Sequence, residues 1–248
     1  MLGDAAPSDP FGLVGRLLER KYRVDRVHAV GGYGVVYAGM HLGLDEPIAI
    51  KVLKPAEGVD EDGWADLMLA FADEARTLAR LRHPSVVSIL DSGTTFMGER
   101  TVPWMVLEWL DGETLGAELE RRNRTGKGGR SPGEALDLLR PVLEAMAVAH
   151  DAGVVHRDLK PSNVMLVPRA GGVSPRVLDF GIAKIMAPDE GGAGTGDTAT
   201  ASHTIAFTAA SAAPEQLSGG RTGPWTDVYA LGLLLTELLT DQPPVPAA

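Results

Sequence analysis

The chain has 248 residues, of which 44% are hydrophobic and 23% charged, with a formal net charge of −10 and no cysteine. This composition is typical of a globular chain long enough for one domain or for two lobes with a substantial core. The negative charge argues against nucleic acid or an anionic membrane surface as the main partner, and the lack of cysteine excludes disulfides and thiolate zinc sites. No apolar run approaches the roughly 20 residues of a membrane span. A cytoplasmic location is therefore expected, either for a whole protein or for the cytosolic part of a longer, membrane-tethered one.

The first half of the chain predicts a small antiparallel sheet with one helix. Residues 1–20 are expected to form a flexible extension. Strands are expected at 22–29, around 35–37 and at 47–53, then a solvated acidic loop at 57–66, a helix at 67–82, and strands at 86–90 and 103–107. The helix must end at His83-Pro84, because the residue before a proline disfavours the α conformation. The stretch 94–101 is predicted to be a turn region.

Two features of this half could bind phosphate. Glycines at Gly31, Gly32 and Gly34 would let backbone N–H groups approach a phosphate closely, although a hairpin that needs positive φ explains them equally well. Lys51 lies inside an apolar strand, where the alternative is an edge lysine that faces solvent. Glu74 shares an apolar helix face with Phe71 and Leu78, so it needs a cationic partner, and Lys51 is the obvious candidate.

The second half predicts mainly helices. A linker is expected at 108–112, followed by helices at 113–124 and 132–152, strands at 164–167 and 176–178 joined by a turn at 168–175, and a helix at 226–239. The 132–152 helix has Leu136, Leu139, Leu143 and Met146 on one stripe. The last helix is apolar nearly all round between Val228 and Leu235, which predicts a buried central helix, and Asp227 could cap its start.

The stretch from His156 to Asn163 carries several groups suited to one chemistry. Asp158 can accept a proton from an attacking hydroxyl, Lys160 can hold a phosphoryl oxygen, and Asn163 can complete a Mg²⁺ shell. Phosphoryl transfer needs these groups, because its catalysis is mostly positioning and charge stabilisation.

The motifs occur in one order along the chain. Ala29-x-Gly31-x-x-Gly34-x-Val36 is followed by Ile48-Ala49-Ile50-Lys51, Glu74, the His156–Asn163 stretch, Asp179-Phe180-Gly181 and Ala213-Pro214-Glu215. Over residues 20–240 this set resembles the eukaryotic-like (Hanks-type) protein kinase family, and its details look most like the bacterial serine/threonine protein kinases. The resemblance implies an α+β, two-lobed protein-kinase-like fold. A small antiparallel-sheet N-lobe with one helix would span residues 21–107, and a hinge would span 108–112. A mainly helical C-lobe that lacks the family's last helices would span 113–248.

The resemblance implies roles for the matching positions. Asp158 would take or orient the substrate proton, Lys160 would steady the γ-phosphate, and Lys51, paired to Glu74, would contact the α- and β-phosphates of ATP. Asn163 and Asp179 would hold Mg²⁺, with Mn²⁺ as an alternative ion. Nucleotide contacts are implied for Ala29, Val30, Gly31, Gly32, Tyr33, Gly34, Val36, Ala49, Lys51, Leu107, Glu108 and Leu110.

The same resemblance implies structural and regulatory roles. His156 and Phe180 would stack, Asp227 would anchor the catalytic loop, and Glu215 would pair with an Arg from the absent helices. Arg157 implies phosphorylation of the 182–212 segment, because a phosphate would neutralise it. The candidates are Thr200 and Ser202, then Thr198 and Thr204. Thr208 would bond Asp158 and Lys160 on the substrate side.

Two stretches depart from the family pattern. Ala29 replaces the first glycine, and Phe207–Ser211 replaces the usual substrate-side wall. The expected function is an ATP- and Mg-dependent protein serine/threonine kinase that acts on protein substrates. The alternatives are a pseudokinase that binds a nucleotide or a partner, or a small-molecule phosphotransferase. Self-association through an uncovered 226–239 helix is also expected.

Overall fold

The computed structural model describes residues 8–32, 34–54, 61–97, 100–180 and 211–244. By its internal contacts the chain divides into two compact units: Met1–Arg82 with Val87–Asp111, and His83–Val86 with Gly112–Ala248. The short stretch His83–Val86 therefore groups with the second unit, although it lies inside the predicted N-lobe range. Val86 forms an isolated parallel bridge with Val177, and Val177 N–H donates to the Ser85 carbonyl at 2.7 Å.

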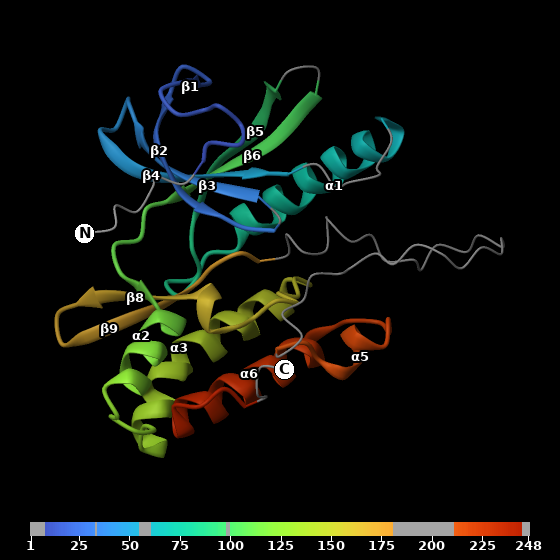
Figure 1. Ribbon diagram of the computed structural model, residues 1–248. Coiled ribbons are helices and arrows are strands. Elements are labelled where there is room, and N and C mark those ends of the chain that lie inside the picture. Colours follow the sequence, from blue (N-terminus) through green and yellow to red (C-terminus); the bar gives the residue numbers. More distant parts are fainter. Residues whose placement is uncertain (1–7, 33, 55–60, 98–99, 181–210, 245–248) are drawn as a thin grey trace. The chain divides into compact units, whose positions relative to one another are not determined.

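The first unit is built on a six-stranded antiparallel sheet (Figure 1). Its strands are β1 (Leu17–Leu18), β2 (Tyr22–Val30), β3 (Gly34–His41), β4 (Glu46–Leu53), β5 (Ile89–Met97) and β6 (Arg100–Glu108), in the order β1-β2-β3-β4-β6-β5. One face of β4 carries Ile48, Ile50 and Val52 into a hydrophobic core. Because side chains alternate along a strand, Ala49 and Lys51 point to the other face.

The segment before β2 is part of this core, which corrects the expected flexible extension over residues 8–20. Leu13 is only 1% exposed and packs with Leu18 and the sheet residues. The Asp9 carboxylate accepts hydrogen bonds from Val14 N–H at 2.9 Å and from the Tyr37 hydroxyl at 2.7 Å. Burial of the Leu13 and Leu18 side chains removes apolar surface from water, which stabilises the packing of this segment on the sheet. Residues 1–7 lie outside the described residues.

Helix α1 (Glu61–Arg80) begins six residues before the predicted start. The predicted acidic loop contains Trp64, whose indole N–H donates to the Thr101 carbonyl of β6 at 2.8 Å. This tertiary contact holds the early turns of a helix that acidic, Gly-containing composition did not predict. The buried residues Phe71, Ala75 and Leu78 lie on one face, and α1 contacts β5 and β6.

The predicted turn region at 94–101 is wrong. The paired strands β5 and β6 contain the described residues of this region, with Thr94 opposite Pro103 and Met97 opposite Arg100. Thr94, Thr95 and Phe96 favour extended structure, so the strand continues past the polar residues that suggested a turn. The preceding strand also starts later than predicted, at Ile89.

The second unit is mainly helical (Figure 1). Its elements are β7 (Glu113–Thr114), α2 (Leu115–Arg124), α3 (Pro132–Asp151), the 3₁₀ turn η1 (Pro161–Asn163), β8 (Val164–Arg169), β9 (Gly172–Val177), α5 (Pro214–Leu217) and α6 (Pro224–Thr240). Thr114 caps α2, and Ser131 caps α3 through a reciprocal pair with Glu134. The strands β7, β8 and β9 form a small antiparallel sheet.

Two local predictions in this unit need correction. The buried stripe of α3 runs through Ala135, Leu139, Val142, Ala145, Met146 and Ala149, whereas Leu136 and Leu143 are exposed. The turn between β8 and β9 is confined to Ala170 and Gly171, because Arg169 pairs with Gly172. Gly171 has a φ of +86°, which suits a tight turn. Pro168 and Pro175, whose presence predicted a longer turn, lie within strands of a narrow sheet.

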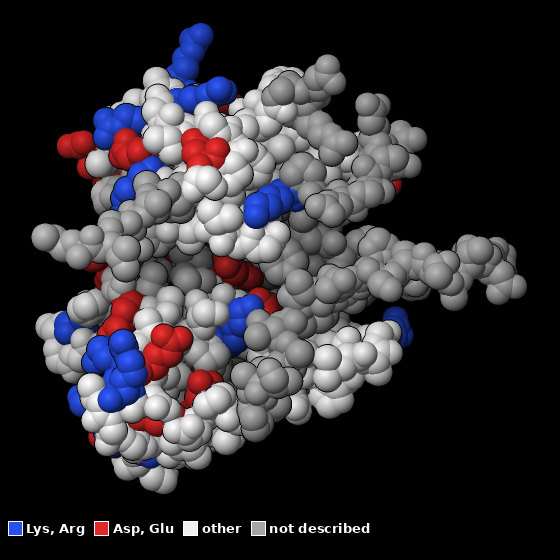
Figure 2. Space-filling view, viewed as in Figure 1, with Lys and Arg blue, Asp and Glu red and all other residues white. Residues whose placement is uncertain are grey.

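Helix α6 is buried on one face only, which corrects the prediction of a helix buried all round. Thr226, Asp227, Ala230, Leu231, Leu234 and Leu238 are buried, but Trp225 and Val228 are 58% and 61% exposed. The cap residue is Gly223, and Asp227 sits one turn inside, where its carboxylate has other partners. Among the described residues, no helix combines the length and hydropathy required to cross a membrane. In Figure 2 basic and acidic side chains are interspersed on the visible described surface, without an extended field of one sign.

Candidate active site

The Gly-rich turn lies in the first unit, between β2 and β3. Gly31 N–H donates to the Gly34 carbonyl at 2.9 Å, and the Lys54 ammonium donates to the Gly31 carbonyl at 2.9 Å. β2 and β3 do form a hairpin, but Gly31 and Gly32 have no positive φ, so a need for positive φ does not explain these two glycines. Gly34 is required for space, because a Cβ there would lie 2.3 Å from the Val52 carbonyl oxygen. Gly31 and Gly32 are exposed, and their backbone is open to a ligand.

Lys51 sits on β4 with its side chain on the face opposite the hydrophobic core. Its cross-strand partner on β3 is Val36, and Ala49 pairs with Leu107 of β6, so these four side chains share one face of the sheet. Lys51 is only 7% exposed, which is unusual for a lysine and marks it as more than an edge residue. Glu74 is half-buried on α1, next to Ala75. The Lys51–Glu74 pair stays a prediction.

The end of β6 carries the other predicted nucleotide residues. Glu108 is bound to Ser88, the residue before β5, because its backbone N–H donates to the Ser88 carbonyl at 3.1 Å and its carboxylate accepts from Ser88 N–H at 2.6 Å. Leu107 and Leu110 are half-buried, and Ala29 and Val30 are exposed. Sequence reasoning missed Trp109, whose ring meets His28 edge-on at 5.1 Å between centroids and lies 5.9 Å from the Arg26 guanidinium carbon. No local sequence pattern predicted that Trp109 contacts His28 and Arg26.

The catalytic-loop candidates meet in the second unit. The Lys160 ammonium lies 2.9 Å and 3.1 Å from the two Asp158 carboxylate oxygens. The Asn163 amide nitrogen donates to the Asp158 carbonyl at 2.7 Å and to its carboxylate at 3.1 Å. The turn η1 brings Asn163 back to Asp158, and the buried side chain of Leu159 anchors the loop in the hydrophobic core. A carboxylate, an ammonium and an amide therefore face one small volume.

Asp227 holds this loop from α6. Its fully buried carboxylate accepts hydrogen bonds from the backbone N–H groups of His156 and Arg157, both at 2.8 Å, and contacts His150 Nε2 at 2.7 Å. Arg157 has a φ of +66°, a conformation that costs about 1 kcal/mol or more for a non-glycine residue. Two hydrogen bonds to a buried carboxylate offset that cost, so Asp227 sets the backbone shape that presents Asp158.

Other contacts fix the loop on its second side. The His156 ring contacts the Leu178 carbonyl at 2.7 Å and packs on Phe180 at 4.8 Å between ring centroids. Leu178 N–H donates to the Asn163 carbonyl at 2.8 Å, which ties the loop to the Asp179 region. Gln216 of α5 donates to the Arg157 carbonyl at 2.7 Å. Sequence reasoning missed Gln216 and His150, because their partners are 59 and 77 residues away along the chain.

Asn163 and Asp179 are suitable as magnesium ligands. Asn163 uses its amide nitrogen toward Asp158, which leaves its amide oxygen for a cation. Asp179 is half-buried and has a φ of +57°, so its backbone holds a restricted conformation. Mg²⁺ needs only one or two protein oxygen ligands when phosphates and waters complete its shell. Within the described part of the chain no group of three or more His, Cys, Asp or Glu side chains could hold a metal ion.

Several predicted site residues lie outside the described residues: Tyr33, Thr198, Thr200, Ser202, Thr204 and Thr208. Ser211 is described and is half-buried. The Glu215 carboxylate accepts a hydrogen bond from the Thr226 hydroxyl at 2.7 Å, which links α5 to the first turn of α6.

Comparison with known proteins decides the family. The model of the family described as "Protein kinase domain" matches residues 22–248. The chain belongs to the protein kinase family. The serine/threonine-protein kinase PknL of Mycobacterium tuberculosis is 36% identical over 241 residues, which cover 97% of this chain and 54% of PknL. PknA of the same organism is 36% identical over 234 residues, which cover 93% of this chain and 49% of PknA.

A solved structure gives the same family and confirms the predicted fold class. The crystal structure of the M. tuberculosis PknI kinase domain aligns with a TM-score of 0.65 and 27% identity, covering 91% of this chain and 76% of that chain. The kinase domain described here spans about half the length of the curated relatives that it matches. The motif order therefore predicted the family and the α+β fold correctly.

Proposed function

We propose that this kinase domain transfers the γ-phosphate of ATP to serine or threonine hydroxyls of proteins. The arrangement of Asp158, Lys160 and Asn163 is the observation that carries the proposal, because these three polar side chains converge in the second unit. The relatives PknL and PknA are named serine/threonine-protein kinases, which supports the same substrate class.

The proposed step follows from this geometry. A substrate hydroxyl hydrogen-bonds to the Asp158 carboxylate, its oxygen forms a bond to the γ-phosphorus, and the bond from that phosphorus to the bridging oxygen of ADP breaks. Asp158 takes the hydroxyl proton, and Lys160 beside it stabilises negative charge on the transferred group. Lys51 binds the α- and β-phosphates with Glu74 as its partner, and the Gly31–Gly34 turn covers them. The other predicted nucleotide-binding residues are also proposed to contact ATP: Ala29, Val30, Tyr33, Val36, Ala49, Leu107, Glu108 and Leu110.

Asn163 and Asp179 would hold Mg²⁺, or Mn²⁺ in its place. Such an ion, when bound, neutralises charge on the β- and γ-phosphates. The two residues offer an amide oxygen and a carboxylate, the hard donors that this ion prefers.

We also propose regulation by phosphorylation of the 182–212 segment at Thr200 or Ser202, with Thr198 and Thr204 as further candidates. Arg157 supports this, because its Nε is buried and has no hydrogen-bond partner among the described residues. A phosphate would supply that partner and neutralise the guanidinium. Mass spectrometry after incubation with ATP and Mg²⁺ tests the proposal, and an unmodified 182–212 peptide from an active preparation would remove it.

Self-association through α6 and a cytosolic location complete the proposal. The exposed Trp225 and Val228 give α6 an apolar outer face, which favours contact with a second copy. Sedimentation velocity of the chain beside Val228→Ser tests this: the wild type should sediment faster with rising concentration, and the variant should not. A wild type that remains monomeric throughout would rule it out.

Transfer of radiolabelled γ-phosphate to a serine/threonine protein substrate tests the main proposal. The wild type should label the substrate in a Mg²⁺-dependent reaction, and Asp158→Asn should not. Equal labelling by both proteins would favour the pseudokinase alternative for this chain.

A further inference from the structure

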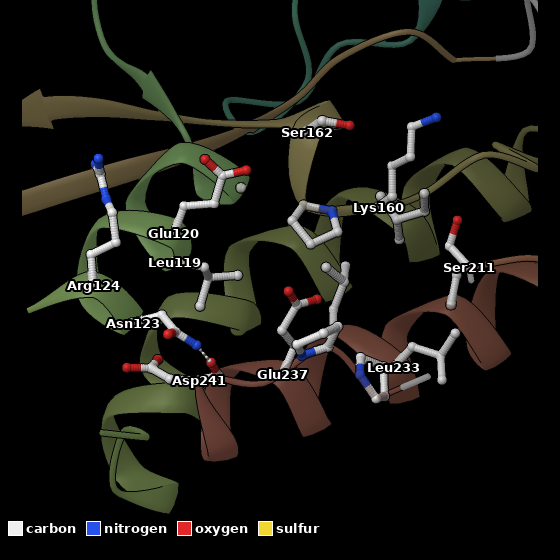
Figure 3. A pocket seen from close by; sticks show the side chains of 17 residues that line it. Leu119, Glu120, Asn123, Arg124, Lys160, Ser162, Ser211, Leu233, Glu237 and Asp241 are labelled. Carbon is white, nitrogen blue, oxygen red and sulfur yellow. Dashed lines mark hydrogen bonds between the residues drawn. The ribbon is translucent and has the colours of Figure 1, made fainter. Parts of the chain in front are cut away.

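Lys54 is a lysine of the first unit that has no part in the proposed transfer step. Among the lysines that do, Lys160 lies at the wall of a pocket of about 640 Å³ beside the catalytic loop of the second unit (Figure 3). Lys54 lies one residue beyond the end of β4, and its ammonium donates a hydrogen bond to the Gly31 carbonyl at 2.9 Å. Gly31 itself lies one residue beyond the end of β2. Because β2 and β4 flank β3 in the sheet, the Lys54 side chain spans the start of β3 to reach the Gly-rich turn.

Within the described residues, few other contacts fix the orientation of this turn. Gly31 N–H donates to the Gly34 carbonyl at 2.9 Å, which closes the base of the turn. A Cβ placed on Gly32 would meet nothing within 4 Å, so no neighbouring group of the described structure packs against this residue. The hydrogen bond from Lys54 is therefore a main restraint on the Gly31–Gly32 backbone.

The contact also sets the direction of a second backbone group. The peptide bond between Gly31 and Gly32 is planar and trans, so its carbonyl oxygen and its N–H point in opposite directions. With the Gly31 carbonyl held on the Lys54 ammonium, the Gly32 N–H is directed away from that ammonium. This N–H makes no hydrogen bond to a described residue, and Gly32 is exposed. Since glycine has wide backbone freedom, the peptide plane is free to rotate once the contact is lost.

We propose that Lys54 is a positioning residue for ATP. Its hydrogen bond to Gly31 holds the Gly31–Gly32 peptide in the orientation in which the Gly32 N–H donates to a phosphate oxygen of the nucleotide. The proposal rests on the proposed kinase function, in which the Gly31–Gly34 turn covers the phosphates. A turn that is already oriented binds more tightly, because the nucleotide need not select a minor conformation. Lys54 acts through the peptide and does not itself touch the phosphate.

Titration calorimetry with MgADP and with adenosine tests the proposal on the kinase domain as it exists. Lys54→Gln should raise the Kd for MgADP by about fivefold, as expected for the loss of one exposed hydrogen bond from a charged donor. Lys54→Arg keeps a charged donor and should stay within about twofold of the wild type. The Kd for adenosine, which has no phosphate, should stay unchanged in both variants. In transfer assays the KM for ATP should rise with the Kd for MgADP, while kcat stays within about twofold.

A double-mutant cycle separates positioning from direct contact with the phosphate. Gly32→Pro removes the N–H, whereas Gly32→Ala keeps it and adds only a methyl group in open space. Lys54→Gln should have its effect of about fivefold in the Gly32→Ala background and none in the Gly32→Pro background. Lys21→Gln is the matched control for charge, because Lys21 lies at the start of β2 and pairs with Asp91 at 3.7 Å. Its loss should leave the Kd for MgADP unchanged.

The amide signal of Gly32 in glycine-labelled protein gives a second readout that does not need Gly32→Pro to fold. This signal is identified by its loss in Gly32→Ala. Saturating MgADP should shift it in the wild type and shift it much less in Lys54→Gln.

Several results would overturn the proposal. These are an unchanged Kd for MgADP in Lys54→Gln, an equal loss of adenosine affinity, or a wild type that binds no MgADP. A full effect of Lys54→Gln in the Gly32→Pro background, or an undiminished shift of the Gly32 amide, would also overturn it, because Lys54 would then contact the phosphate directly. A wild type that binds MgADP but transfers no phosphate would remove the proposed kinase function, while the binding ratios would still decide the role of Lys54.

Discussion

Asp227→Ala is the substitution whose effect the structure defines most closely. The carboxylate of Asp227 is fully buried and accepts two backbone N–H groups, from His156 and Arg157, and contacts the His150 ring. Alanine would leave three polar groups without this partner, one in the buried His156 and two in the half-buried Arg157 and His150. The substitution also frees the backbone of Arg157 from the contact that holds its positive φ.

The expected loss of stability follows from these contacts. A hydrogen bond to a charged group contributes about 1.5–3 kcal/mol, but removing the carboxylate also removes the cost of burying it. The net loss should therefore be about 3–5 kcal/mol, which is typical of breaking a buried charged pair. At roughly 2–4 °C per kcal/mol for a unit of this size, the Tm should fall by about 6–20 °C. The catalytic loop should also lose its shape, so phosphate transfer should fall at temperatures where the variant is still folded.

Thermal unfolding followed by calorimetry, together with transfer assays below the variant Tm, measures both effects. Asp151→Asn is the matched control, because Asp151 is an exposed aspartate at the end of α3 and its loss should change stability by about 0.5 kcal/mol or less. A Tm loss below about 2 °C for Asp227→Ala would refute the reasoning. So would full activity in the folded variant, because the loop would then not depend on its anchor.

Three further predictions concern the first unit. Leu13→Ala should lower the free energy of unfolding, measured with denaturant, by about 2–4 kcal/mol. Leu17→Ala, at an exposed position, should lower it much less. Equal small effects of the two substitutions would mean that the segment before β2 is not part of the core. Gly34→Ala should raise the KM for ATP and lower stability by about 1–3 kcal/mol, because its Cβ would meet the Val52 carbonyl oxygen, and unchanged values would contradict the close approach. Burial alone would raise the pKa of Asp9, but hydrogen bonds from Val14 and Tyr37 lower it below its ordinary value. The stability from Asp9 should therefore be present at neutral pH and lost as the pH falls through its folded pKa, so wild type should lose more Tm than Asp9→Asn between about pH 6 and pH 3; parallel curves would refute this.

Local patterns in the sequence predicted much of this fold. The strand that carries Lys51, the helix that carries Glu74 and the loop from His156 to Asn163 each have a local signature, either alternation, helical spacing or a dense polar motif. The order of these motifs also predicted the kinase family, which the comparisons confirm.

The errors came from contacts between residues far apart in the chain. The segment with Leu13 looked like a loose extension, because its core partners on the sheet lie beyond any local window. Helix α1 starts early with the help of a hydrogen bond from Trp64 to Thr101, a residue 37 positions away. Helix α6 looked buried all round because its composition is apolar, whereas only one of its faces is covered in the described structure.

The same limit applied to the site. The convergence of Asp158, Lys160 and Asn163 could be predicted because eight consecutive residues contain them, while their catalytic roles stay predictions. The supporting residues His150 and Gln216 carry no motif, because their partners Asp227 and Arg157 lie far away along the chain. Such features depend on packing and need a structure.

The most direct test of the central claim is the rate of γ-phosphate transfer to a threonine peptide by the wild type and by Asp158→Asn, with the labelled residue identified by phosphoamino-acid analysis. Loss of a positioned general base should lower the rate by about 10²–10⁴-fold. We predict phosphothreonine from the wild type and a fall within that range for the variant. Equal rates from the two proteins would contradict the assignment of Asp158 and with it the proposed kinase mechanism.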